Sequence, residues 1–152
     1  MRVETTRFGA LEAGEEEFLG FPDGLYGFGD VHRYLVVNRR GESPFQWLQS
    51  VDRPDLAFVV LDPSLFCPGY RIDLSAEDRQ ALGWDGRSAL DVWVVVGVPD
   101  NPEKMTANLK GPIIVNRARR IGRQVILPGD EWSPRHNVID GIRGERRAVF
   151  GG

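Results

Sequence analysis

The side chains best suited to covalent chemistry are one cysteine, Cys67, and two histidines, His32 and His136. A thiol nucleophile needs a histidine positioned as its base, and neither histidine lies near Cys67 in the sequence. We therefore expect Cys67 to be a small buried hydrophobe and the histidines to have surface or structural roles. A small hydrolase that uses His136 with a serine or with Asp130 is the one catalytic alternative.

Cofactor and metal sites have little support in the sequence. Zinc sites require clusters of Cys, His or Asp/Glu at close spacing, and two histidines and one cysteine do not supply such a cluster. The stretch 24–29 superficially resembles a phosphate-binding loop, but no helix is expected to follow it and supply amide groups. Because Phe21, Tyr26 and Phe28 accompany these glycines, we predict a packed aromatic turn. The sequence thus predicts no cofactor, no metal and no enzymatic activity.

An acidic cluster is formed by Glu15, Glu16 and Glu17, which we place at the start of a strand. Successive side chains of a strand point to opposite faces, so the three carboxylates cannot converge on one substrate. Two interpretations stay open, a solvated strand entry or an acidic patch that faces a partner.

A basic cluster surrounds Ile121-Gly122, which we predict to be a hairpin turn. Its members are Arg117, Arg119, Arg120 and Arg123. Such a basic tip could contact a protein, and an RNA-binding barrel that uses the Arg117–Arg123 hairpin is the alternative function.

The overall charge disfavours nucleic acid as the main partner. The net charge is −3, and the first 75 residues carry five more acidic than basic residues. Phosphate binding depends on Lys and Arg, whereas an acidic half suits a basic partner protein. A helix needs about 20 apolar residues to span a bilayer, and no apolar run in the sequence is nearly that long. Residues 1–7 lack the apolar core of a secretory signal. We expect a cytoplasmic protein with no direct contact to nucleic acid or membrane.

Short apolar segments separated by Gly- and Pro-containing turns dominate the chain. The 152 residues predict one domain. We predict strands at 2–8, 15–21, 32–38, 44–51, 56–61, 68–73, 89–98, 112–119 and 123–127. So many strands in a small domain must close or stack to protect their edges. The fold class is therefore mainly β, an antiparallel β-barrel or barrel-like sandwich.

One short α-helix is predicted at residues 76–82. Ser75 is a suitable N-cap, Asp78 stands at the capping-box position, and Gly83 can end the helix. Leu82 could face the core, so that the helix closes one end of a barrel. We assign residues 1–138 to this domain and 139–152 to a flexible basic C-terminal tail.

Six segments carry a recognisable pattern in order along the chain: 21–28, which ends in Tyr26-Gly27-Phe28; Ser43-Pro44-Phe45 through Leu48-Gln49-Ser50; 56–63; Thr106-Ala107-Asn108-Leu109 through Pro112-Ile113-Ile114 and Asn116; 122–127; and Arg135-His136. Together they resemble the FliW family of flagellar assembly factors, whose turn corresponding to 21–28 contains Phe-Gly-Phe. The resemblance covers residues 1–137, and the chain after Val138 departs from the expected pattern of a minimal member.

This resemblance implies a non-enzymatic, cytoplasmic β-barrel that binds flagellin and the translational regulator CsrA, and we expect it to be a monomer. Flagellin and CsrA would compete for the protein. Once flagellin has been exported, the freed protein would antagonise CsrA and so couple flagellin synthesis to export.

The expected partner-binding residues fall into three groups. Flagellin exposes segments that become amphipathic helices, which need an apolar groove with a polar rim, and rim aromatics could supply one: Phe66, Tyr70, Trp84 and Trp132. Glu15, Glu16 and Glu17 could repel RNA phosphates near bound CsrA. Thr106, Asn108 and Lys110 either satisfy backbone groups within a long turn or contact the partner.

Overall fold

The computed structural model describes residues 1–38, 43–140 and 142 of the chain. Within these residues most of the regular structure is β. The strands are β1 (Arg2–Thr5), β2 (Gly9–Glu12), β3 (Phe18–Gly20), β4 (Arg33–Val37), β5 (Gln46–Ser50), β6 (Ala57–Leu61), β7 (Leu90–Gly97), β8 (Thr106–Ala107), β9 (Ile113–Asn116), β10 (Ile121–Gln124) and β11 (His136–Asn137).

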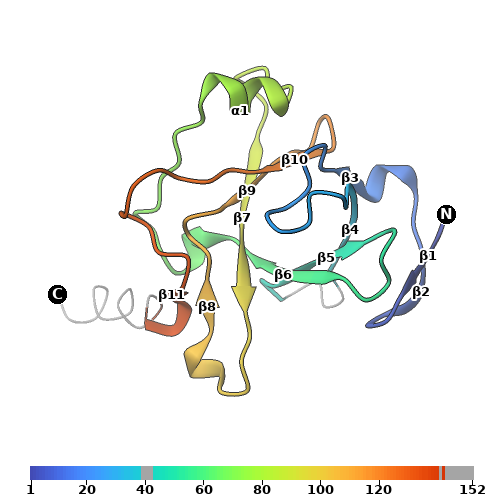
Figure 1. Ribbon diagram of the computed structural model, residues 1–152, viewed down its shortest axis with the longest axis horizontal. Helices are drawn as coiled ribbons and strands as arrows, with labels where there is room; N and C mark the ends of the chain where they lie inside the picture. The colour runs from blue at the N-terminus through green and yellow to red at the C-terminus, as the bar shows by residue number, and fades with distance from the viewer. Residues whose placement is uncertain (39–42, 141, 143–152) are drawn as a thin grey trace.

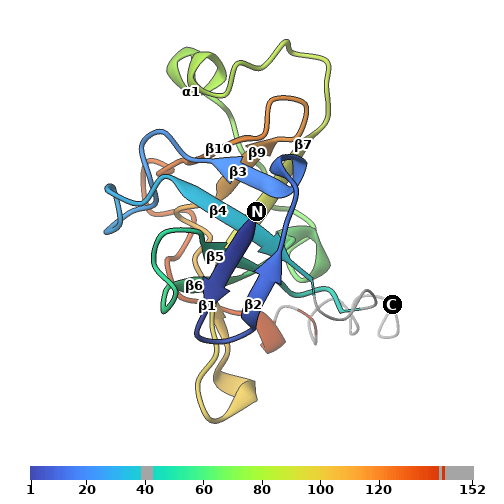
Figure 2. The same cartoon turned by 90° about the vertical axis from the view of Figure 1, so that its right-hand side faces the viewer.

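Seven of the described strands close into a barrel (Figures 1 and 2). Their order is β7-β6-β5-β4-β3-β10-β9, and β9 pairs with β7 to complete the ring. Neighbours are antiparallel except at β3 and β10, which run parallel and share one register pair, Gly20 with Ile121. The predicted barrel is therefore confirmed, with one parallel pairing that the sequence did not indicate.

Two additions lie outside this ring. β1 and β2 form a separate antiparallel hairpin that contributes Val3 to a cluster with Ala13 and Leu35. β8 pairs with the end of β7, and β11 pairs with β8. In both views the chain between β7 and β8 projects from the end of the molecule opposite α1 (Figures 1 and 2).

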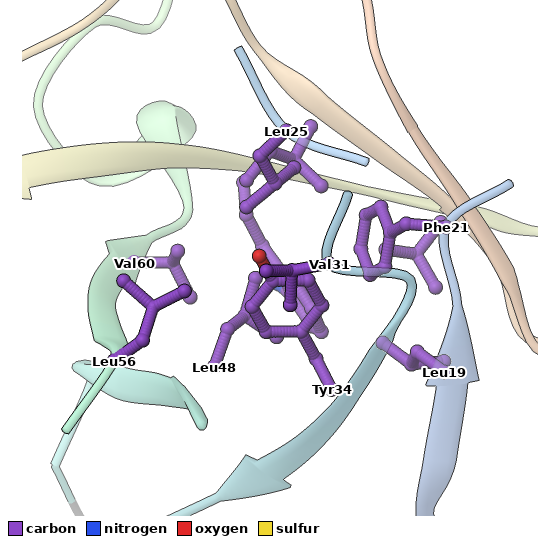
Figure 3. Packing of buried hydrophobic residues seen from close by; sticks show 11 residues of the cluster. Leu19, Phe21, Leu25, Val31, Tyr34, Leu48, Leu56 and Val60 are labelled. Atoms are coloured by element: carbon purple, nitrogen blue, oxygen red, sulfur yellow. The ribbon is translucent and has the colours of Figure 1, made fainter. Parts of the chain in front are cut away.

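The barrel interior is filled by large apolar side chains. β-Branched and aromatic residues suit such strands because they pack well on a pleated surface. Tyr34 and Phe21 are fully buried and meet edge to face, with ring centroids 5.3 Å apart. Trp93, which we expected to be in the core, is 8% exposed. Figure 3 shows Tyr34 among the other buried hydrophobic residues that fill the barrel interior.

The predicted helix is present as α1 (Ala76–Ala81). Ser75 Oγ accepts a hydrogen bond from the Asp78 amide at 3.0 Å, and the Asp78 carboxylate accepts one from the Ser75 amide at 3.2 Å. This reciprocal pair is the capping box expected from the sequence. Gly83, at φ +59°, takes the left-handed conformation that ends a helix. Leu82 is fully buried against the outer face of the barrel.

Several predicted strand positions are wrong. Residues 68–73 form no strand, and residues 15–17 form a 3-10 turn before β3. The turn expected at Ile121-Gly122 lies instead at residues 117–120, and both residues belong to β10. Strands β2, β8 and β11 were not predicted. β8 and β11 are only two residues long, too short for a periodic sequence signal.

The chain after β11 begins with helical residues at 138–140. Asn137 Oδ1 accepts a hydrogen bond from the Asp140 amide at 2.8 Å, and Ile142 packs against the apolar cluster that contains Val138. Residues 141 and 143–152 of the predicted flexible tail lie outside the described residues.

Candidate functional site

Tyr70, Trp132 and the 106–110 loop, all expected to bind a partner, lie together in the structure. The Tyr70 hydroxyl donates a hydrogen bond to the Leu109 carbonyl at 2.5 Å, and its ring meets Trp132 edge to face at 4.8 Å. The Lys110 ammonium donates to the Gly129 carbonyl. Burial raises the pKa of Tyr70, so the phenol stays protonated and able to donate. These contacts tie three distant segments of the chain together.

Asn108 organises the turn that precedes β9. Its Oδ1 accepts hydrogen bonds from the amides of Lys110 at 3.1 Å and Gly111 at 3.0 Å. Thr106 belongs to β8, between Gly97 of β7 and Asn137 of β11. The geometry thus supports the interpretation in which this loop satisfies its own backbone groups, while Thr106 and Lys110 remain half-buried.

Trp84 and Phe66 differ in their exposure. Trp84 is half-buried, donates from Nε1 to the Ser88 carbonyl at 2.8 Å, and lies beneath the Arg79 guanidinium at 5.4 Å. It packs on the same apolar cluster as Tyr70 and Trp132. Phe66 is only 2% exposed, inside the cluster with Leu61 and Val94. The expectation that Phe66 is a rim aromatic is therefore wrong.

Glu15, Glu16 and Glu17 are exposed on a 3-10 turn. Because they do not lie on a strand, the expected alternation between two faces does not apply. Glu16 and Glu17 line an open hollow of about 310 Å³ together with Arg117 and Arg120. The acidic cluster therefore faces the basic turn across an apolar floor that includes Trp93.

The arginines that we predicted to form a basic tip lie partly on the turn and partly within β10. Arg117, on the turn, pairs with Asp91. Arg123 lies within β10, where its side chain is 20% exposed and pairs with three carboxylates, those of Asp23, Glu77 and Asp78. Two of the four arginines thus have acidic partners within the described part of the chain, which leaves a weaker basic surface than the sequence suggested.

Asp78 is the most buried of those carboxylates. Burial opposes its ionisation, but hydrogen bonds from Ser75 and from Arg123 outweigh this effect and lower the pKa of Asp78. The aspartate is therefore charged at neutral pH and can hold Arg123 against α1.

An apolar groove that the sequence did not indicate crosses the sheet beside β5, β6 and β7. It holds about 650 Å³ and is lined by Arg7, Phe45, Trp47, Ala57, Phe58, Val59, Val95, Val96, Val98 and Met105. The Arg7 guanidinium lies 4.3 Å from the centre of the Trp47 ring, and Phe8 meets that ring edge to face. Val98 is 57% exposed. An apolar floor with a cation at its edge suits an amphipathic segment.

The residues considered for catalysis lie in different surroundings. Cys67 is half-buried, and burial raises the pKa of its thiol, which disfavours the reactive thiolate. His32 is exposed and hydrogen-bonds the Gly29 carbonyl at 2.8 Å. His136 lies in β11, with its ring 5.8 Å from that of Phe66. Among the described residues no group of three or more His, Cys, Asp or Glu side chains could hold a metal.

Comparison with known proteins gives one consistent result. The family model described as FliW protein matches residues 2–138. This chain belongs to the FliW family. The flagellar assembly factor FliW of Ruminiclostridium cellulolyticum is 41% identical over 94% of this chain and 97% of the relative. That of Thermoanaerobacter pseudethanolicus is 40% identical over 94% and 96%.

A solved structure supports the same assignment. The crystal structure of a flagellar assembly factor FliW superposes with a TM-score of 0.84 at 32% identity, covering 91% of this chain and 96% of that one. The FliW resemblance drawn from the sequence and the β-barrel that it implied are both confirmed. In the described part of this FliW-family chain, no helix has the length and apolar character needed to cross a membrane.

Proposed function

We propose that this FliW-family protein is a non-enzymatic, cytoplasmic, monomeric factor that binds flagellin and, when freed of it, binds and antagonises the translational regulator CsrA. The observation that carries the proposal is membership of the flagellar assembly factor family across residues 2–138. Binding of proteins also fits a barrel whose interior is filled with side chains, because recognition must then use its outer surface.

The apolar groove is the surface that we assign to flagellin. A terminal flagellin segment that becomes an amphipathic helix could place its apolar face on Trp47, Val59 and Met105, which line the groove. An acidic side chain of that helix could meet Arg7, the cation at the edge of the groove.

The experiment is a titration of purified flagellin and purified CsrA against the protein, followed by competition between the two. We expect each partner to bind alone and flagellin to displace CsrA. Absence of binding to both would refute the proposal.

A charged substitution tests the groove. Val98→Asp places a carboxylate on an exposed groove position, and we expect it to weaken flagellin binding at least about tenfold. Leu65→Asp is the matched control, because Leu65 is similarly exposed, 47% against 57%, and does not line the groove. Equal loss of affinity in both variants would contradict the assignment.

Glu15, Glu16 and Glu17 are proposed to weaken RNA binding by captured CsrA through their negative field. Replacing all three with Gln should leave the fold intact, because the side chains are exposed. A gel-shift assay that shows undiminished inhibition of RNA binding would refute this role. Arg117 and Arg120 face Glu16 and Glu17 across the hollow, and their positive charge would explain such a result by offsetting the field of the glutamates.

Direct RNA binding through the Arg117–Arg123 segment is the second candidate. It would show as RNA affinity of the isolated protein that falls steeply with salt. The ion pairs of Arg117 and Arg123 disfavour it, because a phosphate would have to displace the carboxylates already bound there.

A further inference from the structure

A second exposed surface lies at the loop between β3 and β4, beside β10 and α1. It is an open hollow of about 460 Å³, lined by Asp23, Gly24, Leu25, Tyr26, Gly27, Gly29, Glu77, Arg123, Gln124 and Ile126. Tyr26 is 82% exposed and Ile126 is 55% exposed. The predicted packed aromatic turn is thus only partly correct, because Phe21 is buried and Tyr26 points into solvent. Two large apolar side chains are therefore exposed at the same hollow, where a bound protein would cover both.

The loop that carries Tyr26 is fixed in place from several directions. The Tyr26 amide donates to Gln124 Oε1 at 2.6 Å, and Gln124 Nε2 donates to the Gly111 carbonyl at 2.9 Å. Leu25, 3% exposed, anchors the loop in the core and forms a β-bridge with Phe28. A partner that binds Tyr26 would therefore not have to order the loop, so little binding free energy would be lost to this step.

Glycine is required at the start of this loop. Gly24 has φ +68°, and a Cβ there would lie 2.4 Å from the Phe28 carbonyl oxygen. The close backbone approach and the positive φ both exclude a larger residue without strain. This local constraint holds the loop in the shape that presents Tyr26.

The charge that this hollow presents to solvent is negative. The side chains of Asp23 and Glu77 are 71% and 85% exposed, whereas that of Arg123 is 20% exposed. Arg123 lies beneath and is already paired with Asp23 at 2.5 Å, Glu77 at 3.6 Å and Asp78 at 3.0 Å. Three carboxylates around one cation leave net negative charge beside exposed Tyr26 and Ile126.

We infer that this hollow, centred on Tyr26 and Ile126, docks a folded protein whose surface carries Lys or Arg around an apolar depression. Tyrosine is enriched among the residues that dominate interface energies, because it combines a large apolar ring with a polar end. The carboxylates of Asp23 and Glu77 would steer the basic partner and fix its orientation.

The inference rests on the proposed function in naming CsrA as that partner, because a regulator that binds RNA needs a surface rich in Lys and Arg. It assigns CsrA to this hollow and leaves the groove near Trp47 to flagellin. The two partners then contact different elements of the fold. Displacement of CsrA by flagellin would result either from coupling between the two surfaces or from steric overlap of the two bound proteins.

The test compares the affinities of purified CsrA and purified flagellin for Tyr26→Ser and Ile126→Ser. We expect each substitution to weaken CsrA binding at least about tenfold while flagellin affinity changes less than about twofold. The melting temperature should stay nearly constant, because both side chains are mostly exposed. Leu65→Ser, at an exposed position outside both the hollow and the groove, is the matched control for CsrA.

A variant that removes one negative charge separates the electrostatic attraction of CsrA from the contacts made once it is bound. Glu77→Gln should slow association with CsrA and reduce its dependence on salt, with little change in dissociation. Glu77 is suited to this measurement because its contact with Arg123, at 3.6 Å, is the longest of the three and its side chain is 85% exposed.

The outcomes distinguish the inference from the proposed function. If the wild-type protein binds CsrA and Tyr26→Ser binds it equally well, only the inference is overturned. If Tyr26→Ser loses flagellin instead, the assignment of partners is overturned. A concentration-dependent dimer of the wild type that disappears in Tyr26→Ser would identify a second copy of this chain as the occupant and overturn the inference. A wild-type protein that binds neither partner overturns the proposed function and this assignment together.

Discussion

The Arg123 guanidinium on β10 donates a hydrogen bond from Nε to Oδ1 of Asp78 on α1, with the two atoms 3.0 Å apart. The same guanidinium donates a hydrogen bond to Asp23, which stands one hundred residues earlier in the chain. One side chain therefore joins the helix, the last barrel strand and the loop that presents Tyr26.

Replacing Arg123 with methionine should destabilise the protein by about 2–4 kcal/mol, because Asp78 would keep its charge in a largely buried place without its cation. Arg33→Met is the control. Arg33 also pairs with an aspartate, Asp52, but both side chains are at least 50% exposed, and we expect a loss below about 1 kcal/mol. Urea unfolding measures both, and equal losses would show that the Arg123 pairs act like ordinary surface pairs.

Replacing Tyr34 with phenylalanine should leave stability unchanged or raise it by about 1 kcal/mol. The Tyr34 hydroxyl is fully buried and has no hydrogen-bond partner among the described residues, so its removal abolishes a desolvation cost. A loss of more than about 1 kcal/mol in urea unfolding at neutral pH would indicate that the hydroxyl is satisfied in solution.

The buried Tyr34 phenol should also make the folded protein less stable at alkaline pH. Burial raises the pKa of Tyr34 from 10.0 to about 12, although nearby Arg53 opposes the shift. Above pH 10 the unfolded chain releases this proton and the folded chain keeps it. The free energy of unfolding then falls by about 1.4 kcal/mol per pH unit until the folded-state pKa is reached. Unfolding measured from pH 9 to 12 should show a shallower decline for Tyr34→Phe, with the remaining decline due in part to Tyr70, whose pKa is also raised.

Replacing Gly122 with alanine should destabilise the barrel by about 1–3 kcal/mol, the usual cost of overpacking. A Cβ at this position would lie 2.4 Å from the ring of Phe21, which is itself completely buried. Gly69→Ala is the matched control, since nothing lies within 4 Å of its Cβ position, and it should be neutral or mildly stabilising. Thermal unfolding that ranks the two variants in the opposite order would contradict the packing described for β10.

Replacing Asn108 with alanine should lower stability by about 1–3 kcal/mol, because the amides of Lys110 and Gly111 lose their shared acceptor. Asn101→Ala, which removes a single bond to the exposed Glu103 amide, should cost less. A normal melting temperature combined with lost partner binding would instead favour the interpretation in which Asn108 contacts the partner.

The elements that could be predicted are those with a strong local signal. β4, β6, β7 and β9 lie within predicted strands because their β-branched and aromatic residues recur over several positions, and α1 was marked by the capping box at Ser75. β8 and β11 were missed because each is two residues long and exists only through pairing with a distant strand.

The binding surfaces were harder to predict because they depend on long-range contacts. The sequence does not reveal that Arg123 is occupied by Asp23, Glu77 and Asp78, so the basic tip was overestimated. Phe66 and Tyr26 were misjudged for a related reason. An aromatic residue in a turn can face either way, and only packing determines that Phe66 is covered and Tyr26 is not.

The parallel pairing of β3 with β10 has a consequence for synthesis of the chain. β3 ends at Gly20, but its partner begins at Ile121, about one hundred residues later. At typical translation rates of 5–20 residues per second, the ribosome needs roughly 5–20 s to deliver the strand that seals the ring. Until then the β3 edge has no β10 to cover it, so a nascent molecule passes through a period in which it is open to pairing with other chains.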